Sequence, residues 1–495
     1  MWDCQENTIQ TIYGGGNAAD AGTAAKPADT RLILDGGRFD RVFGGGNGYS
    51  ASGNHTLPYY DGSDCSATVS DTRCPDYNPG ANIFGKASTY VYGGLYRQIF
   101  GGSNQYGDIG TVALTIQKSC DYLMIQECFG GGNEADISSN VETTLLCTTT
   151  GEDYHIGNFY GGSNMASING NVTLNVYGGK YTNVFEGSKG VRGDDPDNSI
   201  SANISDNPAT TDEVEGNVTL NLYGGTMVNA FGGSDAYGAI SGLITVNLLA
   251  SGDCGLQVDT IYGGGRDADY TPDLVDNKKV ISPVVNLLNG TVGHGTGTNL
   301  VPGCVFGGGK GATAIVTAHP KVIIGDTITT GDDASTHINY QAIVLGNVFG
   351  GGNAAAVDGI DSVLMLKANS QVVNLFGGGN KAVADTAVVI MNVAATLDTI
   401  FGGGNLAGLT GPALVDVSAG TVRGGIYGGS NKEGEVQGDI TVNVTGTTTI
   451  GSTGTHANLH GGGYGAGTRT DGDVTVNFGD APTTHSDTPK IFGDI

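Results

Sequence analysis

Short stretches in which apolar residues alternate with threonine and asparagine recur along the chain. Clear examples are residues 172–176 (Val-Thr-Leu-Asn-Val), 218–222 (Val-Thr-Leu-Asn-Leu), 440–444 (Ile-Thr-Val-Asn-Val) and 474–478 (Val-Thr-Val-Asn-Phe). Successive side chains of a β-strand point to opposite faces, so this alternation predicts strands whose first, third and fifth residues face a core. Thr and Asn then face outward. Long amphipathic helical patterns do not occur in the sequence.

A second pattern follows most of these stretches: an aliphatic residue, an aromatic residue, two or three glycines and an asparagine. It reads Ile-Phe-Gly-Gly-Gly-Asn at residues 400–405, and looser copies bring the total to fifteen, the last being residues 491–494. We expect the aromatic position to form one structural column, from which His460 departs. The column comprises Tyr13, Phe43, Phe100, Phe129, Tyr160, Phe185, Phe231, Tyr262, Phe306, Phe349, Phe376, Phe401 and Tyr427.

A motif that returns at nearly constant spacing indicates a repeat array, in which each unit packs on its neighbours. Phe376 and Phe401 are 25 residues apart, and Phe401 and Tyr427 are 26 apart, which suits a turn of two or three short strands. We therefore expect an all-β fold, a single-stranded right-handed parallel β-helix (β-solenoid) of about 14–15 turns, continuous through residues 1–495. Insertions interrupt the spacing at approximately 48–89, 189–216, 267–282 and 317–343.

The motif has a physical explanation that requires no chemistry. Successive turns of parallel strands lie ~4.8 Å apart, which places like residues above one another. The aliphatic residues then face the core, and stacked rings gain roughly 0.5–1.5 kcal/mol per pair beyond their burial. Glycine triplets are expected where the backbone adopts positive φ or approaches another segment closely. The asparagines are expected to hydrogen-bond to the turns above and below.

Charge narrows the range of partners. The chain carries 49 Asp plus Glu against 22 Lys plus Arg, a formal net charge of -27. Such a surface repels phosphate backbones and anionic lipids, so we expect neither a nucleic-acid partner nor membrane insertion. No apolar run approaches the ~20 residues needed to span a bilayer. The first residues lack the basic and apolar regions of a signal peptide.

The eight cysteines form no paired CxxC zinc pattern. Cys65 and Cys74 flank one loop, whereas Cys254 and Cys304 precede consecutive copies of the motif. We predict a disulfide in each of these pairs, which indicates an oxidising, extracellular compartment. Buried free thiols are the alternative, because connectivity does not follow from sequence. Cys128 occupies an aliphatic position of the motif and is expected to be such a thiol.

The combined repeat resembles a known group of proteins. Gly-Asn-Val-Thr-Leu-Asn-Val-Tyr-Gly-Gly at 170–179 and Val-Phe-Gly-Gly-Gly-Asn at 348–353 resemble the β-helical repeats of large bacterial surface proteins. Similar Tyr/Phe-Gly-Gly-Gly-Asn repeats occur in surface and adhesin-like proteins of gut bacteria. The resemblance covers almost the whole chain and implies a right-handed β-solenoid displayed at a cell surface. It implies no catalytic residues, because the family's repeats have none established.

Loops inserted between solenoid turns are the default binding surface of such proteins. The first insertion contains tyrosines that suit the faces of sugars and carboxylates that accept their hydroxyl groups. These candidate glycan-binding residues are Tyr59, Tyr60, Asp61, Asp64 and Tyr77. The alternative is a disulfide-closed loop whose tyrosines pack on the solenoid.

Metal binding and catalysis receive less support from the residues. Asp194, Asp195 and Asp197 are candidate Ca²⁺ ligands in an acidic loop, with a solvated loop as the alternative, and no other cofactor is expected. The best grouping for catalysis is Arg266 with Asp267 and Asp269. Outward strand positions are mostly Thr, Asn and Ser, which lack the paired carboxylates or the basic residue that glycan cleavage needs. We therefore expect no catalytic residues and no enzyme.

These observations predict a secreted or cell-surface rod with an adhesin-like or structural role, which presents loops to an extracellular protein or glycan. One alternative is a filament subunit that stacks end to end, because neither end of the sequence shows an obvious cap. The missing caps also fit a piece of a longer polypeptide. A second alternative is a polysaccharide lyase or hydrolase, since such enzymes also use parallel β-helices; fold analogy alone is a weak reason to prefer it.

Overall fold

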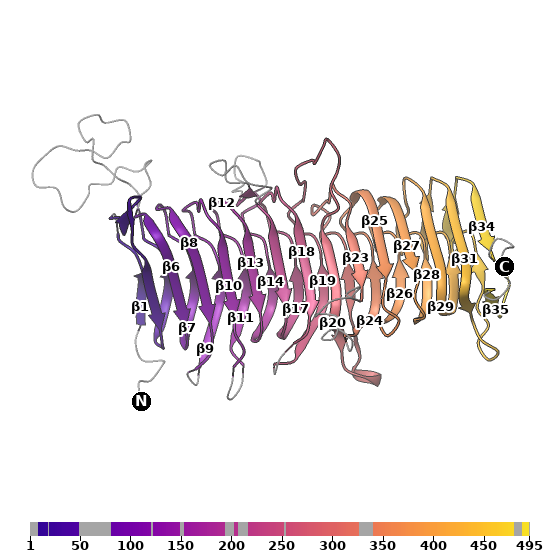
Figure 1. The fold of residues 1–495 in the computed structure, drawn as a ribbon, viewed down its shortest axis with the longest axis horizontal. Helices are drawn as coiled ribbons and strands as arrows, with labels where there is room; N and C mark the ends of the chain where they lie inside the picture. Colours follow the sequence, from indigo (N-terminus) through magenta and orange to yellow (C-terminus); the bar gives the residue numbers. More distant parts are fainter. Residues whose placement is uncertain are drawn as a thin grey trace, which may run out of the picture.

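The chain is an all-β protein whose strands form a long parallel β-solenoid. A computed structural model describes residues 8–17, 19–48, 81–119, 122–148, 153–193, 202–205, 216–251, 254–325, 340–479 and 488–494. Within them, a sheet of 29 strands extends from one end of the molecule to the other. Figure 1 shows the strands side by side across the long axis of a rod, with the N-terminus at one end and the C-terminus at the other.

The alternating stretches form the first side of the solenoid, where each strand pairs in parallel with the next. Register is kept, as Leu174 lies opposite Leu220 and Val176 opposite Leu222. The strands of this side are β4 (Thr30–Leu34), β6 (Ile83–Val91), β8 (Ile109–Ile116), β10 (Val141–Leu145), β13 (Val172–Val176), β16 (Val218–Leu222), β18 (Ile244–Leu249), β20 (Val284–His294), β23 (Lys321–Ile324), β25 (Val357–Met365), β27 (Ala384–Met391), β29 (Ala413–Tyr427), β31 (Ile440–Ile450) and β34 (Val474–Phe478).

The strands that lead into the glycine motif form the second side, again in parallel and in register. The longest strands, β29 among them, bend around the corner and belong to both sides. The second side comprises β1 (Thr8–Tyr13), β5 (Arg38–Phe43), β7 (Gly94–Phe100), β9 (Leu123–Phe129), β11 (His155–Tyr160), β14 (Lys180–Phe185), β17 (Gly225–Phe231), β19 (Leu256–Tyr262), β22 (Cys304–Phe306), β24 (Ala342–Phe349), β26 (Gln371–Phe376), β28 (Thr396–Phe401), β32 (Leu459–His460) and β35 (Lys490–Ile491).

A third side closes each turn through very short contacts. Isolated parallel bridges link Ile168 to Ile137 and Leu409 to Val436, for example. The remaining elements are the pairs β12 (Ile168–Asn169) with β15 (Ile204–Ser205), β30 (Glu433–Val436) with β33 (Gly467–Thr470) and antiparallel β2 (Gly22–Thr23) with β3 (Lys26–Pro27), the strand β21 (Val301–Pro302), and the 3-10 turn η2 (Gly297–Asn299). The third side thus consists mainly of loops that two neighbouring turns hold in place.

The interior confirms the predicted alternation. In β13, residues 172, 174 and 176 are buried while Thr173 and Asn175 face outward. The aliphatic residue of the motif is also buried, as Val184 and Ile400 show with no exposed surface. Buried aliphatic side chains from all three sides form one continuous core. At roughly 25 cal/mol per Å² of apolar surface removed from water, burial of this aliphatic core supplies the main driving force for stacking the turns.

The glycines serve two different purposes. At the corner before the second side, Gly179 and Gly225 each adopt φ of +92°, a region that other residues occupy only with strain. The motif triplets do not have positive φ. They are required by close approach instead, since a Cβ on Gly44 would meet the carbonyl oxygen of Gly101 in the next turn. Of the two reasons the sequence suggested, only the second applies to the triplets.

Several predicted boundaries shift in the structure. Strand β6 begins within the predicted insertion 48–89, whereas β15 lies within 189–216 and β23 within 317–343, so these insertions are shorter than expected. In β23 the residues Lys321-Val322-Ile323-Ile324 lack the Thr/Asn alternation that marks other turns. The last motif copy is out of register, because Ile491 pairs with Ile450 rather than with Leu459. Within the described residues no helix has the length and apolar character needed to cross a membrane.

Candidate functional site

The predicted aromatic positions form one continuous stack along the rod. From Tyr13 to His460, consecutive ring centroids lie 4.6–5.3 Å apart with interplanar angles of 4–16°. The rings from Phe43 to Tyr427 are 0–7% exposed and form a second core, separate from the aliphatic one. The imidazole ring of His460 therefore continues the stack, in which every other position is Phe or Tyr.

Asparagine ladders run beside the stack. Where two successive motifs end in asparagine, the later one donates from Nδ2 to Oδ1 of the earlier one, as Asn405 does to Asn380 at 2.8 Å. Near the N-terminus the ladder joins Asn17, Asn47, Asn104, Asn133 and Asn164. Towards the C-terminus it joins Asn353, Asn380, Asn405 and Asn431. Each amide satisfies its neighbour, so the ladder closes the polar edge of the rod from turn to turn.

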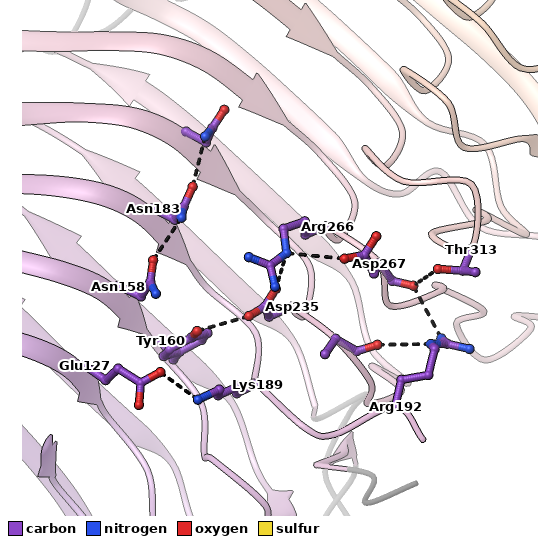
Figure 2. Close-up of polar contacts among 12 residues, drawn as sticks. Glu127, Asn158, Tyr160, Asn183, Lys189, Arg192, Asp235, Arg266, Asp267 and Thr313 are labelled. Atoms are coloured by element: carbon purple, nitrogen blue, oxygen red, sulfur yellow. Dashed lines mark hydrogen bonds and ion pairs between the residues drawn. The ribbon is translucent and has the colours of Figure 1, made fainter. Parts of the chain in front are cut away.

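Four successive turns replace this asparagine with a charged residue. The positions are occupied by Lys189, Asp235, Arg266 and Lys310, which we call the charged ladder. Figure 2 shows the contacts of Lys189, Asp235 and Arg266. Lys189 Nζ lies 2.6 Å from Glu127 Oε1, and Arg266 Nε lies 2.7 Å from Asp235 Oδ1. Within the ladder, the contact between Arg266 and Asp235 thus joins opposite charges in successive turns.

The charged side chains lean over the aromatic stack toward the N-terminus. The hydroxyl of Tyr160, two turns earlier, donates to Asp235 Oδ2 at 3.0 Å (Figure 2). The Arg266 guanidinium lies 5.7 Å from the ring centroid of Phe185, and Lys310 Nζ lies 5.9 Å from that of Phe231, also two turns earlier. A cation over a ring face is attracted by the ring quadrupole. These contacts tie together turns that share no strand pairing.

Burial dominates the electrostatics of this cluster. Burial raises the pKa of the Asp235 carboxyl to about 6, although Arg266 and the Tyr160 hydroxyl act in the opposite direction. Burial, followed by the charge of Asp235, raises the pKa of the Tyr160 hydroxyl as well. The Asp235 side chain is only 2% exposed, so its charge depends on these partners.

Arg266, Asp267 and Asp269, the residues that the sequence favoured most for catalysis, belong to the same network of charged side chains. Arg266 Nε contacts both Asp235 and, at 3.3 Å, Asp267 Oδ2. Arg192 Nη2 pairs with Asp269 Oδ1 at 3.4 Å and with the main-chain oxygen of Asp267 at 3.3 Å. Thr313 donates to that same oxygen (Figure 2). These groups are held in ion pairs that bridge turns, an arrangement that stabilises structure.

A groove crosses the outer face of the second side near the N-terminal end. It has a volume of about 710 Å³ and is lined by strands β5, β7, β9 and β11 together with Tyr122. Side chains at the first outward position of each strand form a row along it: Arg38, Leu95, Met124 and His155. Lys180 of β14 continues this row. The row therefore places cations at both ends of an apolar stretch.

An ion pair crosses the floor of the groove. Arg97 Nη2 donates to Asp40 Oδ2 at 3.0 Å, and Nε contacts the other carboxylate oxygen, so the guanidinium engages the carboxylate with two bonds. These bonds hold the pKa of Asp40 below its usual range. Both side chains remain 41% exposed. A second groove, of about 630 Å³, lies further along the same face and includes Asp398 and Arg423.

The cysteine prediction requires a correction. Cys254 forms a disulfide with Cys147, at a Cα–Cα distance of 6.0 Å, and Cys304 is free. The predicted pair Cys254–Cys304 is therefore wrong. Cys304 lies in an outward column between Thr260 of β19 and Asn347 of β24. Cys254 instead precedes the first residue of β19, whereas Thr260 lies near the end of that strand. The fact that Cys254 and Cys304 precede consecutive copies of the motif therefore did not indicate that the two cysteines lie close together. Cys128 is a buried free thiol, as expected.

Two carboxyl groups lie in the interior without an ion-pair partner. Glu186 replaces the first glycine of its motif, and Asp361 lies in β25; both side chains have no exposed surface. Burial raises the pKa of each well above its ordinary value. Their carboxylate oxygens make no side-chain hydrogen bond within the described part of the chain. These groups are isolated from the groove and from one another along the rod.

Several predicted site residues lie outside the described residues. They are the loop residues Tyr59, Tyr60, Asp61, Asp64 and Tyr77, the cysteines Cys65 and Cys74, and the acidic residues Asp194, Asp195 and Asp197. Among the residues that the structure does describe, no group of three His, Cys, Asp or Glu side chains is placed to hold a metal ion.

Sequence reasoning missed both the groove and the charged ladder. The signal for the ladder was available, because Lys189, Asp235, Arg266 and Lys310 occupy the asparagine position of the motif. The groove required the register between strands that lie 25 to 57 residues apart in sequence, as between Asp40 and Arg97. Comparisons with models of protein families, with curated proteins and with solved structures gave no match.

Proposed function

We propose that the protein is a structural, adhesin-like rod of the cell surface or extracellular space, which holds ligand-binding surfaces along its side. The observation that carries this proposal is the unbroken aromatic stack, which joins successive turns from Tyr13 to His460. A stack of that length, beside a continuous aliphatic core, makes a stiff support rather than a closed pocket. About fourteen turns at the ~4.8 Å spacing of parallel strands give a rod of roughly 70 Å.

Two features support an extracellular setting. The disulfide Cys147–Cys254 persists in oxidising compartments and is rare in the cytosol. The net charge of -27 favours solubility and discourages attachment to nucleic acid or anionic lipid. An extracellular protein or a glycan is the partner that fits this surface best.

The chemistry of the N-terminal groove supports binding rather than catalysis. Asp40 is the single carboxylate among the described residues that line this groove, and Arg97 engages both of its oxygens. Glycoside hydrolysis needs two carboxyl groups roughly 5–9.5 Å apart, one of them protonated at neutral pH. The lowered pKa of Asp40 is the opposite of what a general acid requires.

Electron microscopy of the purified chain over a concentration series tests the architectural part of this proposal. We expect single rods of roughly 70 Å at every concentration. Fibres that lengthen with concentration would instead support the alternative of a self-assembling filament. A glycan array with the same preparation tests binding, and release of reducing ends or unsaturated products from the bound glycans would overturn the non-catalytic role.

A further inference from the structure

The N-terminal groove differs in charge from the protein as a whole. The described residues that line it include Arg38 and Arg97 against one carboxylate, Asp40, while the whole chain carries a formal charge of -27. Because Arg97 is paired with Asp40, the unbalanced charge belongs to Arg38. Arg38 is exposed, and its side chain makes no ion pair or hydrogen bond with another described residue. A guanidinium in this situation is available to an anion.

The row along the groove is amphiphilic. Leu95 and Met124 separate Arg38 from His155 and Lys180, and Met124 is 42% exposed. The Tyr122 hydroxyl donates to Met124 Sδ at 2.7 Å, which holds the phenol beside this apolar stretch. Gly157 adds no side chain where the groove reaches β11. Apolar and aromatic surface with a few polar groups at its margins suits a ligand that has both apolar faces and charges.

The position of the groove limits the kind of ligand. It lies on the face of a sheet, across four strands whose backbone groups are already paired with their neighbours. An extended peptide gains most of its affinity from backbone hydrogen bonds to an open strand edge, which this face does not offer. A sugar chain is recognised through side chains alone, so the face of the sheet favours a glycan.

From this juxtaposition we infer that the N-terminal groove binds an acidic glycan, a polysaccharide whose sugar rings carry carboxylates. The inference rests on the proposed function and adds the class of ligand. Arg38 binds a carboxylate through its planar, two-pronged guanidinium. Leu95, Met124 and Tyr122 contact the apolar faces of the sugar rings, and Gln126 and His155 bond to hydroxyl groups. The chain runs along the rod axis, from Arg38 toward Lys180.

Binding of a hexamer of galacturonic acid, measured by calorimetry with the full chain, tests this inference. Its fully methyl-esterified form is the matched ligand without charge. We expect the acid to bind and the ester to bind at least about tenfold more weakly, since a charge-assisted hydrogen bond is lost. The Arg38→Gln variant should lose about the same factor for the acid and little for the ester. Affinity for the acid should fall as salt is raised.

Control variants separate the groove from general charge. Lys432→Gln removes one exposed cation from a turn far from the groove and should leave affinity unchanged. Met124→Glu places a carboxylate in the apolar stretch and should abolish binding of the acid, whereas Met124→Gln should reduce it less. Because Arg38 and Met124 are exposed, we expect these variants to fold, which circular dichroism checks.

Several results would overturn the inference. Equal binding of acid and ester would show a glycan site that does not read charge, and an unchanged affinity of Arg38→Gln would show that Arg38 is not the group that binds the carboxylate; in both cases the proposed function would survive. Binding of hexaglutamate with the same dependence on Arg38, without binding of either glycan, would identify an acidic peptide as the ligand. Binding of none of these probes would refute both the ligand class and the groove's role as a binding surface.

Discussion

Two parts of the rod use the same motif in different ways. In the middle segment, residues 185–310, the ladder beside the stack carries charges, and insertions lengthen the turns: Phe185 and Phe231 are 46 residues apart. In the regular segment, residues 349–431, the ladder is asparagine throughout, and its hydrogen bonds span 25 to 27 residues. Ring stacking is nevertheless the same, with centroids 4.6–5.3 Å apart in both segments.

The comparison teaches that the aromatic stack and the polar ladder are separate devices. The spacing of the rings is the same beside either ladder, although the charged side chains also contact rings of the stack. A uniform asparagine ladder offers the same hydrogen bonds to any turn, so it does not distinguish one neighbour from another. The charged ladder does distinguish them, because Lys189 is attracted to Glu127 and Arg266 to Asp235. Polar groups that specify register in this way are known from coiled coils.

The largest effect should come from removing a ring, and it should be equal in both segments. Phe401→Ala in the regular segment and Phe231→Ala in the middle segment should each cost ~3–5 kcal/mol of unfolding free energy. Both rings are at most 5% exposed and are stacked on two sides. Denaturant unfolding measures the loss. A cost well under 1 kcal/mol at Phe401 would argue against a packed column.

Breaking the disulfide should affect residues 147–254, which overlap the middle segment, and not the regular segment. Cys147 and Cys254 close a loop with a sequence separation of 107 residues, and replacing both by Ser should cost about 2–5 kcal/mol. Hydrogen exchange should accelerate between them and stay unchanged in the regular segment, since solenoid turns contact only their neighbours. Cys304→Ser, a free thiol between Thr260 and Asn347, is the matched control. Faster exchange throughout the rod would contradict the local role.

The two ladders should respond differently to truncation. Arg266→Ala leaves the buried Asp235 carboxylate without its cation and should cost about 1–3 kcal/mol. Asn405→Ala removes neutral amide bonds in the regular segment and should cost only about 1 kcal/mol. The double variant Asp235→Asn/Arg266→Asn rebuilds an asparagine pair and should recover most of the loss. If the double variant is no more stable than Arg266→Ala, the loss in Arg266→Ala does not come from an unpaired Asp235 carboxylate.

The smallest effects should appear with pH and should be common to both segments. Burial raises the folded-state pKa of Glu186 and of Asp361, so each contributes stability below its unfolded pKa, about 4, and loses it as pH rises toward the folded pKa. Glu186→Gln and Asp361→Asn should therefore be more stable than the wild type at pH 8 and similar to it near pH 4. Thermal melts at the two pH values measure this. A wild type that is the more stable protein at pH 8 would show that the buried carboxylates have charge-stabilising partners.

Most of the architecture was predictable because each turn repeats the same local pattern. Residues 172–176 and 218–222 alternate between core and surface as expected, and they align residue by residue. Strand β23 escaped prediction because its Lys321-Val322-Ile323-Ile324 sequence carries no outward Thr or Asn. Little of the candidate site was predictable. The groove brings Arg38 beside Leu95 and Met124, which are far apart in sequence and share no motif.

What the sequence determined by itself was the repeating cross-section: period-two alternation buries one set of side chains, and like residues in successive turns stack. The tertiary structure alone decided which turns lie close to each other across the insertions and which residues form each outward row. The disulfide of Cys254 with Cys147, instead of Cys304, is one such outcome, and the row from Arg38 to Lys180 is another. The physical reason is that inward positions are constrained by one shared core, which every turn must match. Outward positions meet side chains of nearby turns, one or two turns away, and those neighbours are known only once the register is set.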